Sequence, residues 1–315
     1  AVMDGYFPMQ YPSESNLDGP DWEPFIISRN EERIVVQKSY KAKGKRIWKD
    51  SVDVYYVADP PTEEVKLETL GLPPEPEKFE AIEGVKEVDR SPGGLARIME
   101  LMGDQGLVGL EVVSSRALTS MEAIYEYYEH PELHEKWALE RVEKVERRFR
   151  DIRAMEIKPD FICVGGSGTL VFQTLDIFKQ LAFPAVNRAI ELATELGLPT
   201  HVHSCGPEKE LVKLMAEESN LSIIDPLEIP PMGDCNLSEL KKLYGDKIIL
   251  KGNLHTTEVM LNPDVNVVID AAKKAIDDAA RGGGFILSTG DQCGRDTPDK
   301  NLFALVETAR TYGRY

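Results

Sequence analysis

Strand-sized apolar runs alternate with helical patterns over most of this chain, and this alternation constrains its fold more than any other feature. From about Ser91 onward, each short apolar run is followed by a segment whose apolar residues recur at spacings of three and four, as in an amphipathic helix. Repeated βα units of this kind build a parallel sheet. The predicted strands are Leu107–Val113, Phe161–Val164, Thr200–His203, Leu221–Ile224, Ile248–Lys251 and Phe285–Ser288.

The helices predicted between these strands are long enough to cover a sheet. The longest begins after Pro131 and carries an apolar stripe that includes Ala138, Val145 and Phe149. The others are predicted at Ala185–Leu196, Glu208–Ser219, Leu237–Tyr244, Val265–Arg281 and Asp299–Tyr312.

Six strands, with one or two more from the N-terminal region, approach the eight of a (β/α)8 TIM barrel. We therefore predict an α/β fold of this type with an N-terminal β-rich elaboration. A doubly wound open sheet is the alternative. It is less favoured, because the run Gly165-Gly166-Ser167-Gly168 lacks the rest of a dinucleotide-binding fingerprint.

Residues 1–90 differ from the rest in being aromatic, proline-rich and β-prone. Short β-rich runs occur at Phe25–Ile27, Arg33–Gln37 and Val52–Val57, with turn residues between them. The predicted organisation is an N-terminal β-rich extension, 1–90, packed on a barrel domain, 91–315.

Composition excludes several classes of protein. The 37 Lys and Arg against 54 Asp and Glu give a net charge of −17, which opposes binding to nucleic acid or an anionic membrane. No apolar stretch reaches the ~18 residues of a membrane span. The four cysteines are too few and too scattered for a disulfide framework, and the first residues lack the pattern of a secretory signal, so we expect a cytoplasmic protein.

The rare histidines and cysteines gather at one predicted strand end, His201-Val202-His203-Ser204-Cys205. Side chains alternate along a strand, so His201, His203 and Cys205 would share one face at the edge where barrel enzymes keep their sites. Imidazole nitrogen and thiolate sulfur are preferred Zn²⁺ ligands. His203 and Cys205 are therefore candidate metal ligands, whereas a histidine at the position of His201 is more often a core residue than a ligand.

Two further candidate ligands follow other predicted strands. Cys293 follows the strand Phe285–Ser288, and Glu228 lies just past Leu221–Ile224. Together with His203 and Cys205 they would form a tetrahedral site with one nitrogen, two sulfur and one oxygen donor. Cys163 and Cys235 instead fit the usual role of a small buried apolar side chain.

Two other positions depart from their surroundings. Glu111 lies in an otherwise apolar predicted strand, where a carboxylate is costly unless it is paired or protonated; a catalytic role and a structural ion pair are both open. Asn253 ends the strand that begins at Ile248, and either donates an amide into the barrel mouth or satisfies a strand-end turn.

At these residues the chain resembles the uroporphyrinogen decarboxylase superfamily, and within it the zinc-dependent, corrinoid-linked methyltransferases. The resemblance spans roughly Ser91–Tyr315. It is carried by Pro159–Ile162, by Gly197–Thr200 leading into His203–Gly206, by Tyr244–Ile248 leading into Lys251–Asn253, and by Gly282–Phe285 leading into Cys293 and Asp296–Pro298.

The resemblance implies a (β/α)8 barrel whose zinc is held by a His-x-Cys pair and a distant cysteine, which His203, Cys205 and Cys293 match. Cobalamin-independent methionine synthase is similar in adding a glutamate, a role that Glu228 fits. The Arg-x-x-Gly-Arg-like run with which true uroporphyrinogen decarboxylases bind a tetrapyrrole is absent, so we do not expect porphyrinogen decarboxylation.

The sequence therefore predicts a zinc-dependent methyltransferase that moves a methyl group between a small O- or S-methyl compound and a corrinoid protein, with an aromatic methyl ether preferred. The corrinoid would come on the partner, because no corrinoid-binding domain is recognised in this chain. Glu111 and Asn253 are the catalytic candidates, and His201 and Asp291 the candidates for contacting substrate. The alternatives are a metal-free decarboxylase of a smaller substrate and a non-catalytic barrel that binds a corrinoid protein.

Overall fold

The structure is a computed structural model that describes residues 6–7, 9–14, 22–57, 63–82, 89–118 and 120–314. Two compact units divide the chain: Ala1–Ser13 together with Asp89–Tyr315, and Glu14–Val88. The larger unit thus takes in the start of the chain, which the predicted division at residue 90 assigns to the extension. Packing of the smaller unit on the larger one stays a prediction.

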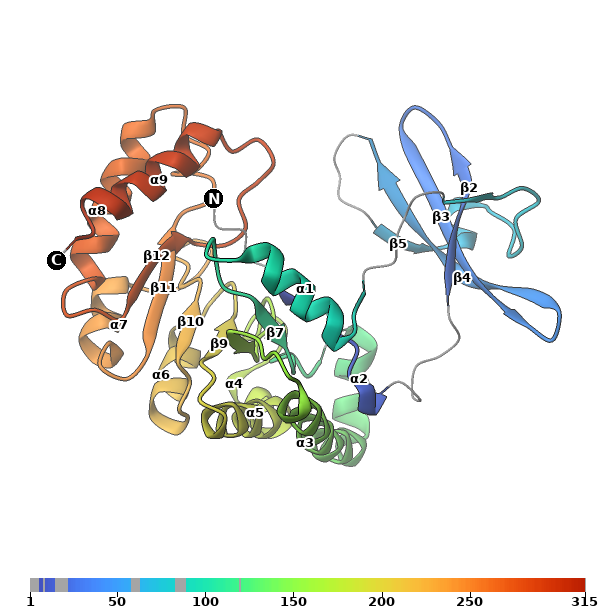
Figure 1. Ribbon diagram of the computed structural model, residues 1–315, viewed down its shortest axis with the longest axis horizontal. Coiled ribbons are helices and arrows are strands. Elements are labelled where there is room, and N and C mark those ends of the chain that lie inside the picture. Colours follow the sequence, from blue (N-terminus) through green and yellow to red (C-terminus); the bar gives the residue numbers. More distant parts are fainter. Residues whose placement is uncertain are drawn as a thin grey trace. The chain divides into compact units, whose positions relative to one another are not determined.

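A seven-stranded parallel sheet forms the centre of the larger unit (Figure 1). Its order is β1 (Tyr6–Phe7), β7 (Gly109–Glu111), β8 (Phe161–Cys163), β9 (Thr200–His203), β10 (Ile223–Asp225), β11 (Ile249–Leu254) and β12 (Phe285–Thr289). All six strands predicted in this region are present. The seventh, β1, pairs with β7 at the edge of the sheet.

Helices follow the strands of this sheet. They are α1 (Pro92–Met102), α2 (Met121–Glu129), α3 (Pro131–Ala154), α4 (Leu175–Ile177), the π-helical segment η3 (Phe178–Ala182), α5 (Phe183–Glu195), α6 (Lys209–Glu218), α7 (Leu237–Tyr244), α8 (Val265–Ala279) and α9 (Asp299–Thr311). Of the helices longer than one turn, only α1 and α2 were not predicted. The sequence does contain a helix-start signal for α1, a serine at the N-cap followed by a proline in the first turn. In the structure the Ser91 hydroxyl accepts hydrogen bonds from the amides of Gly93 and Gly94. Among the described residues, no helix has the length and apolarity to cross a bilayer.

The strand order decides between the two predicted architectures. Strands follow one another in sequence order across the whole sheet, without the reversal that defines a doubly wound sheet. The sheet is therefore TIM-barrel-like, as predicted, but among the described residues β1 and β12 are its two edges and the barrel is not closed. The strands of residues 22–82 pair with one another in a separate sheet and supply no eighth parallel strand.

The two faces of the sheet have different chemistry. Val202, Ile224 and Leu250 stand side by side in register and are completely buried, in the same apolar core as residues of α5, α7 and α8. One position further along, His203 is in register with Asp225, so their side chains share the opposite face. The sheet thus places polar side chains together on the face that the long helices do not cover.

The smaller unit is an antiparallel sheet in the order β5 (Glu63–Lys66), β4 (Lys45–Tyr56), β3 (Arg33–Ala42), β2 (Glu23–Arg29) and β6 (Glu80–Ala81). Hairpins join β2 to β3 and β3 to β4, and Lys43 and Gly44 adopt the left-handed conformation that a tight two-residue turn requires. Its own apolar core is built around Val35, Val52 and Val54. The short 3₁₀ segments Pro12–Glu14 and Leu67–Leu70 complete the described elements.

Candidate metal centre

Four strands deliver polar side chains to one edge of the parallel sheet. His203 is the last residue of β9, Asp225 ends β10, Asn253 is next to last in β11, and β12 leads directly into the loop that carries Asp291. The C-terminal ends of parallel strands lie at the same edge, which is where barrel enzymes bind substrates. The predicted location of the site agrees with this arrangement.

Three potential metal ligands converge there. One ligand atom each of His203, Cys205 and Asp291 lies within 4.8 Å of the other two, and all three residues are partly buried. The Nε2 atom of His203 is 3.8 Å from Oδ1 of Asp291. Nitrogen, sulfur and oxygen donors at this spacing fit the preferences of Zn²⁺.

Asp225 connects this group to the interior of the sheet. Its Oδ1 atom is 2.9 Å from Nε2 of His201 and 3.0 Å from Nδ1 of His203, while its Oδ2 accepts a hydrogen bond from Lys251 at 2.6 Å. The carboxylate is almost fully buried. Burial alone would raise the pKa of Asp225, but the two histidines and the lysine ammonium hold it well below its usual range.

The bond to Asp225 fixes the tautomer of His203. A carboxylate only accepts, so Nδ1 of His203 carries a hydrogen. In the neutral imidazole, the form that binds a metal, the lone pair is therefore on Nε2, which is 3.8 Å from Oδ1 of Asp291. Burial lowers the pKa of His203, yet hydrogen bonds with Asp225 and Cys205 and the nearby carboxylates raise it to about 10. The carboxylates around His203 thus favour a positive charge at this place, which a proton or a metal ion can supply.

The predicted ligand Cys293 lies close by but outside this group. Its thiol is half-buried, and burial raises its pKa while hydrogen bonds with Thr289 and Thr297 oppose that rise. Asp291, which the sequence suggested as a substrate contact, stands among the ligand atoms instead. A role for Cys293 as a ligand stays a prediction.

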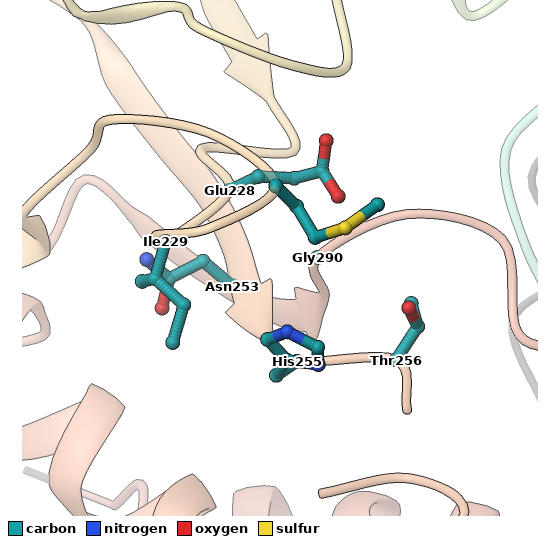
Figure 2. Close-up of a pocket in the computed structure, with 7 residues that line it drawn as sticks. Glu228, Ile229, Asn253, His255, Thr256 and Gly290 are labelled. Carbon is teal, nitrogen blue, oxygen red and sulfur yellow. The ribbon is translucent and has the colours of Figure 1, made fainter. Parts of the chain in front are cut away.

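The predicted ligand Glu228 is buried beside the group, and its Oε2 accepts a hydrogen bond of 2.6 Å from the amide of Gly206. Burial raises the pKa of this carboxyl. Figure 2 shows Glu228 at one side of a small pocket that Asn253, His255 and Gly290 also line. Glu228 therefore ties the loop after β10 to the Cys205 loop, and metal ligation by it stays a prediction.

The loop that carries Glu228 is held by two buried side chains. Asn253 donates from Nδ2 to the carbonyl of Leu227 at 2.9 Å, and the Leu227 amide donates to Oε2 of Glu208 at the same distance. Leu227 itself has a φ of 60°, which a leucine adopts only under tertiary constraint. Asn253 thus satisfies a loop carbonyl, the structural alternative for this residue, and its predicted catalytic role remains untested.

Glu111 lies differently from expectation, whereas His201 is buried as a core histidine is. Glu111 ends β7 and is exposed, so the premise that its carboxylate is buried in an apolar strand is wrong; the strand stops at this residue, where solvent reaches it. His201 is buried against Asp225, with the Phe161 ring edge-on at 5.8 Å between centroids. A catalytic role for Glu111 and a substrate contact for His201 stay predictions.

Sequence reasoning missed three buried charged residues around the site. Asp225 and Lys251 each give a signal, a charged residue at the end of or inside an apolar run, but only strand register shows that they meet. Glu208, fully buried at the start of α6, gives none. Burial raises the pKa of Glu208 well above its ordinary value, and its Oε1 has no hydrogen-bond partner.

Comparison with known proteins gives a family and a fold. The sequence model of the uroporphyrinogen decarboxylase (URO-D) family matches residues 154–312, about half of the chain. No curated protein matches significantly. Among solved structures, a methyltransferase from Methanosarcina mazei is similar in fold, with a TM-score of 0.54 and 18% identity over 81% of this chain and 73% of that one. A citrate lyase from Burkholderia xenovorans LB400 aligns with a TM-score of only 0.33 and 14% identity over 72% and 66% of the two chains, which is too low to indicate a shared fold.

Proposed function

The chain belongs to the uroporphyrinogen decarboxylase family, and from this premise we propose that it is a zinc-dependent methyltransferase acting with a separate corrinoid protein. The observation that carries the proposal is the convergence of His203, Cys205 and Asp291, with Asp225 behind His203. A metal-independent decarboxylase has no need of a thiolate and an imidazole on one ion. The fold shared with a protein named a methyltransferase supports the same choice.

The zinc ligands in this proposal are Nε2 of His203, Sγ of Cys205 and a carboxylate oxygen of Asp291. Cys293 follows Asp291 by two residues in the same loop, so either of them can be the third protein ligand, as the sequence predicts for Cys293. Glu228 completes the predicted set. Zinc bound there would act as a Lewis acid on the oxygen or sulfur of the substrate.

The residues of the chain hold this centre in a defined state. Asp225 keeps the hydrogen of His203 on Nδ1, and the ammonium of Lys251 balances the buried negative charge. Glu208 and Asn253 fix the backbone on either side of Leu227, which positions Glu228 beside the Cys205 loop. The site is thus arranged before substrate binds, which reduces the reorganisation that reaction requires.

The reaction we propose transfers the methyl group of a small O- or S-methyl compound to the corrinoid of the partner, or in reverse. In the forward direction the substrate heteroatom would keep the electron pair of its bond to the methyl carbon, and the reduced corrinoid of the partner would supply the pair for the new bond. The corrinoid partner and an aromatic methyl ether as the donor are parts of this proposal.

Metal analysis of the purified chain tests the proposal most directly. One zinc per chain is expected in the wild type, and much less in Cys205→Ser and Asp291→Asn. Cys235→Ala is the matched control, since this thiol is buried outside the ligand group and its loss should leave zinc in place. Methyl transfer to a supplied reduced corrinoid should follow zinc content. Full methyl transfer by a zinc-free Cys205→Ser variant would refute the role of zinc. Decarboxylation without methyl transfer in that variant would favour the metal-free decarboxylase, and zinc without any turnover would favour the non-catalytic barrel.

A further inference from the structure

Arg116 lies in the loop that follows β7, at the same edge of the sheet as the candidate metal centre. The loops that follow β7 to β12 contain no lysine or arginine other than Arg116 and Arg295, although they carry several carboxylates. Arg295 forms an ion pair with the neighbouring Asp296, and its side chain is 62% exposed. Arg116, in contrast, forms no ion pair with any carboxylate in the part of the chain that the structure describes. In a chain with 54 acidic residues against 37 basic ones, an arginine without an acidic partner is unexpected.

The backbone on both sides of Arg116 is held by one buried side chain. Gln173, in the loop after β8, accepts a hydrogen bond of 2.8 Å from the amide of Ala117 and donates one of 2.9 Å to the carbonyl of Ser115. The hydroxyls of Ser115 and Thr169 are hydrogen-bonded to each other, and both residues are completely buried. The two loops are thus joined, and Arg116 projects from a fixed position, which reduces the ordering that ligand binding would cost.

The side chain of Arg116 extends from this loop in the direction of the metal centre. Its guanidinium carbon is 5.7 Å from the centre of the Phe172 ring, in the loop after β8. Because β8 lies between β7 and β9 in the sheet, this direction leads toward the strand that ends at the metal centre. Val171, which precedes Phe172, stands against Gly206, where an added Cβ would be 2.5 Å from its Cγ2. Arg116 is therefore one loop away from the loop that carries the ligand Cys205.

The terminal nitrogens of Arg116 are available to a ligand. Of the three guanidinium nitrogens, Nε is buried and has no hydrogen-bond partner. Nη1 and Nη2 form no hydrogen bond with the described residues either, but they are not among the buried atoms, so solvent reaches them. Two adjacent N–H donors of a guanidinium match the two oxygens of a carboxylate.

We propose that Arg116 binds the carboxylate of a small ligand whose oxygen or sulfur atom occupies the metal centre. A ligand with one negative charge fits best, because a single arginine balances one charge and the carboxylates of the metal centre repel a second. A methyl ether or thioether that ends in a carboxylate meets both requirements. The identification of this ligand as the methyl donor rests on the proposed function, whereas the binding of a carboxylate by Arg116 does not.

Isothermal titration calorimetry of the zinc-supplied wild-type chain with two pairs of probes tests the proposal. Methoxyacetate and 4-methoxybenzoate differ in length, and methoxyacetamide and 4-methoxybenzamide have the same shapes without the charge. We expect the carboxylate whose length fits the site to bind about 10-fold to 100-fold more tightly than its amide, the effect of hydrogen bonds between charged groups. Amides that bind as tightly as both carboxylates would overturn the proposal.

Three variants assign the effect to one side chain. Arg116→Gln should remove the preference for the carboxylate, whereas Arg116→Lys keeps the charge without the paired donors and should retain part of it. Arg295→Gln is the matched control, because it removes the same charge from another loop at the same edge and should leave the preference unchanged. Zinc content and circular dichroism should not change in any of the three. The proposal fails if the preference survives in Arg116→Gln, as it would if the carboxylate bound to zinc, or if Arg295→Gln lowers it equally.

The outcomes separate this proposal from the proposed function. If Cys205→Ser loses zinc and methyl transfer but still prefers the carboxylate, the arginine site stands by itself. If the wild type demethylates the amides as fast as the carboxylates, the function stands and this inference fails. If no carboxylate is preferred but Arg116→Gln weakens the binding of a corrinoid protein, the arginine belongs to a protein interface and this inference also fails.

Discussion

Replacement of Asp225 by asparagine is the sharpest test of how the candidate metal centre is held. The carboxylate contacts His201, His203 and Lys251 at once, and its side chain is only 4% exposed. Asparagine keeps the shape but removes the charge. Its amide nitrogen only donates, so the single oxygen cannot replace both the acceptor of the histidines and the acceptor of Lys251. Asp225→Asn therefore leaves the buried ammonium of Lys251 without a counter-ion, and the hydrogen of the His203 imidazole is no longer held on Nδ1.

The size of both effects follows from this geometry. Removing one partner of a buried ion pair costs about 3–5 kcal/mol, which for a chain of this length corresponds to a fall in Tm of about 5–8 °C. Loss of the carboxylate that orients a metal-bound histidine costs about 10-fold to 100-fold in metal affinity. Both losses are expected at pH 7.

Thermal unfolding and competitive zinc titration with a chelator measure the two quantities. The pKa of Asp225 is depressed in the folded chain, so its stabilisation is present above the ordinary aspartate pKa of about 3.9 and is lost as pH falls below it. The difference in Tm between wild type and variant should therefore shrink in acid.

A double variant separates charge balance from metal orientation. Asp225→Asn with Lys251→Met removes the orphaned ammonium, and should regain much of the stability but none of the zinc affinity. The reasoning is refuted if Asp225→Asn alone keeps both Tm and zinc affinity at the wild-type values, or if the double variant recovers zinc affinity together with stability.

Three further variants test other parts of the site. Gly206→Ala adds a Cβ at a φ of 93°, 2.5 Å from Cγ2 of Val171. It should destabilise the chain by about 1–3 kcal/mol and lower the zinc content. The control Gly197→Ala, at a φ of 70° with open space around it, should lower stability but leave the zinc content unchanged. Burial raises the pKa of Glu208, so the wild type should lose stability as pH rises above about 4.3, the ordinary glutamate value. Glu208→Gln does not titrate, and its Tm relative to the wild type should therefore increase from pH 4 to pH 8. A difference in Tm that stays constant over this range would contradict the reasoning. Asn253→Ala leaves a buried carbonyl without its donor and should cost about 1–3 kcal/mol by urea unfolding, and a cost near zero would show that the loop after β10 relaxes freely.

The sequence by itself determined the local elements of the fold. Thr200–His203 was predicted with the same ends that the structure gives it, and Leu237–Tyr244 likewise, because period-two and period-3.6 apolar patterns are set by neighbouring residues. The His-x-Cys pair is equally local, since alternation along β9 places both side chains on one face. Strand-sized runs with helices between them also sufficed to predict the parallel sheet.

Tertiary structure alone decided which distant residues join that pair. Asp225 reaches His203 through the register of β9 and β10, and Asp291 enters the ligand group although 86 positions separate it from Cys205. The spacing of residues in the sequence gave no means to prefer Asp291 over Cys293 as a ligand, since the two lie two residues apart in one loop. It also could not show that Glu111 is exposed, or that the sheet has seven strands among the described residues. The physical reason is that periodicity is a short-range property of the chain, whereas register, loop placement and sheet closure depend on packing between segments that the sequence does not bring together.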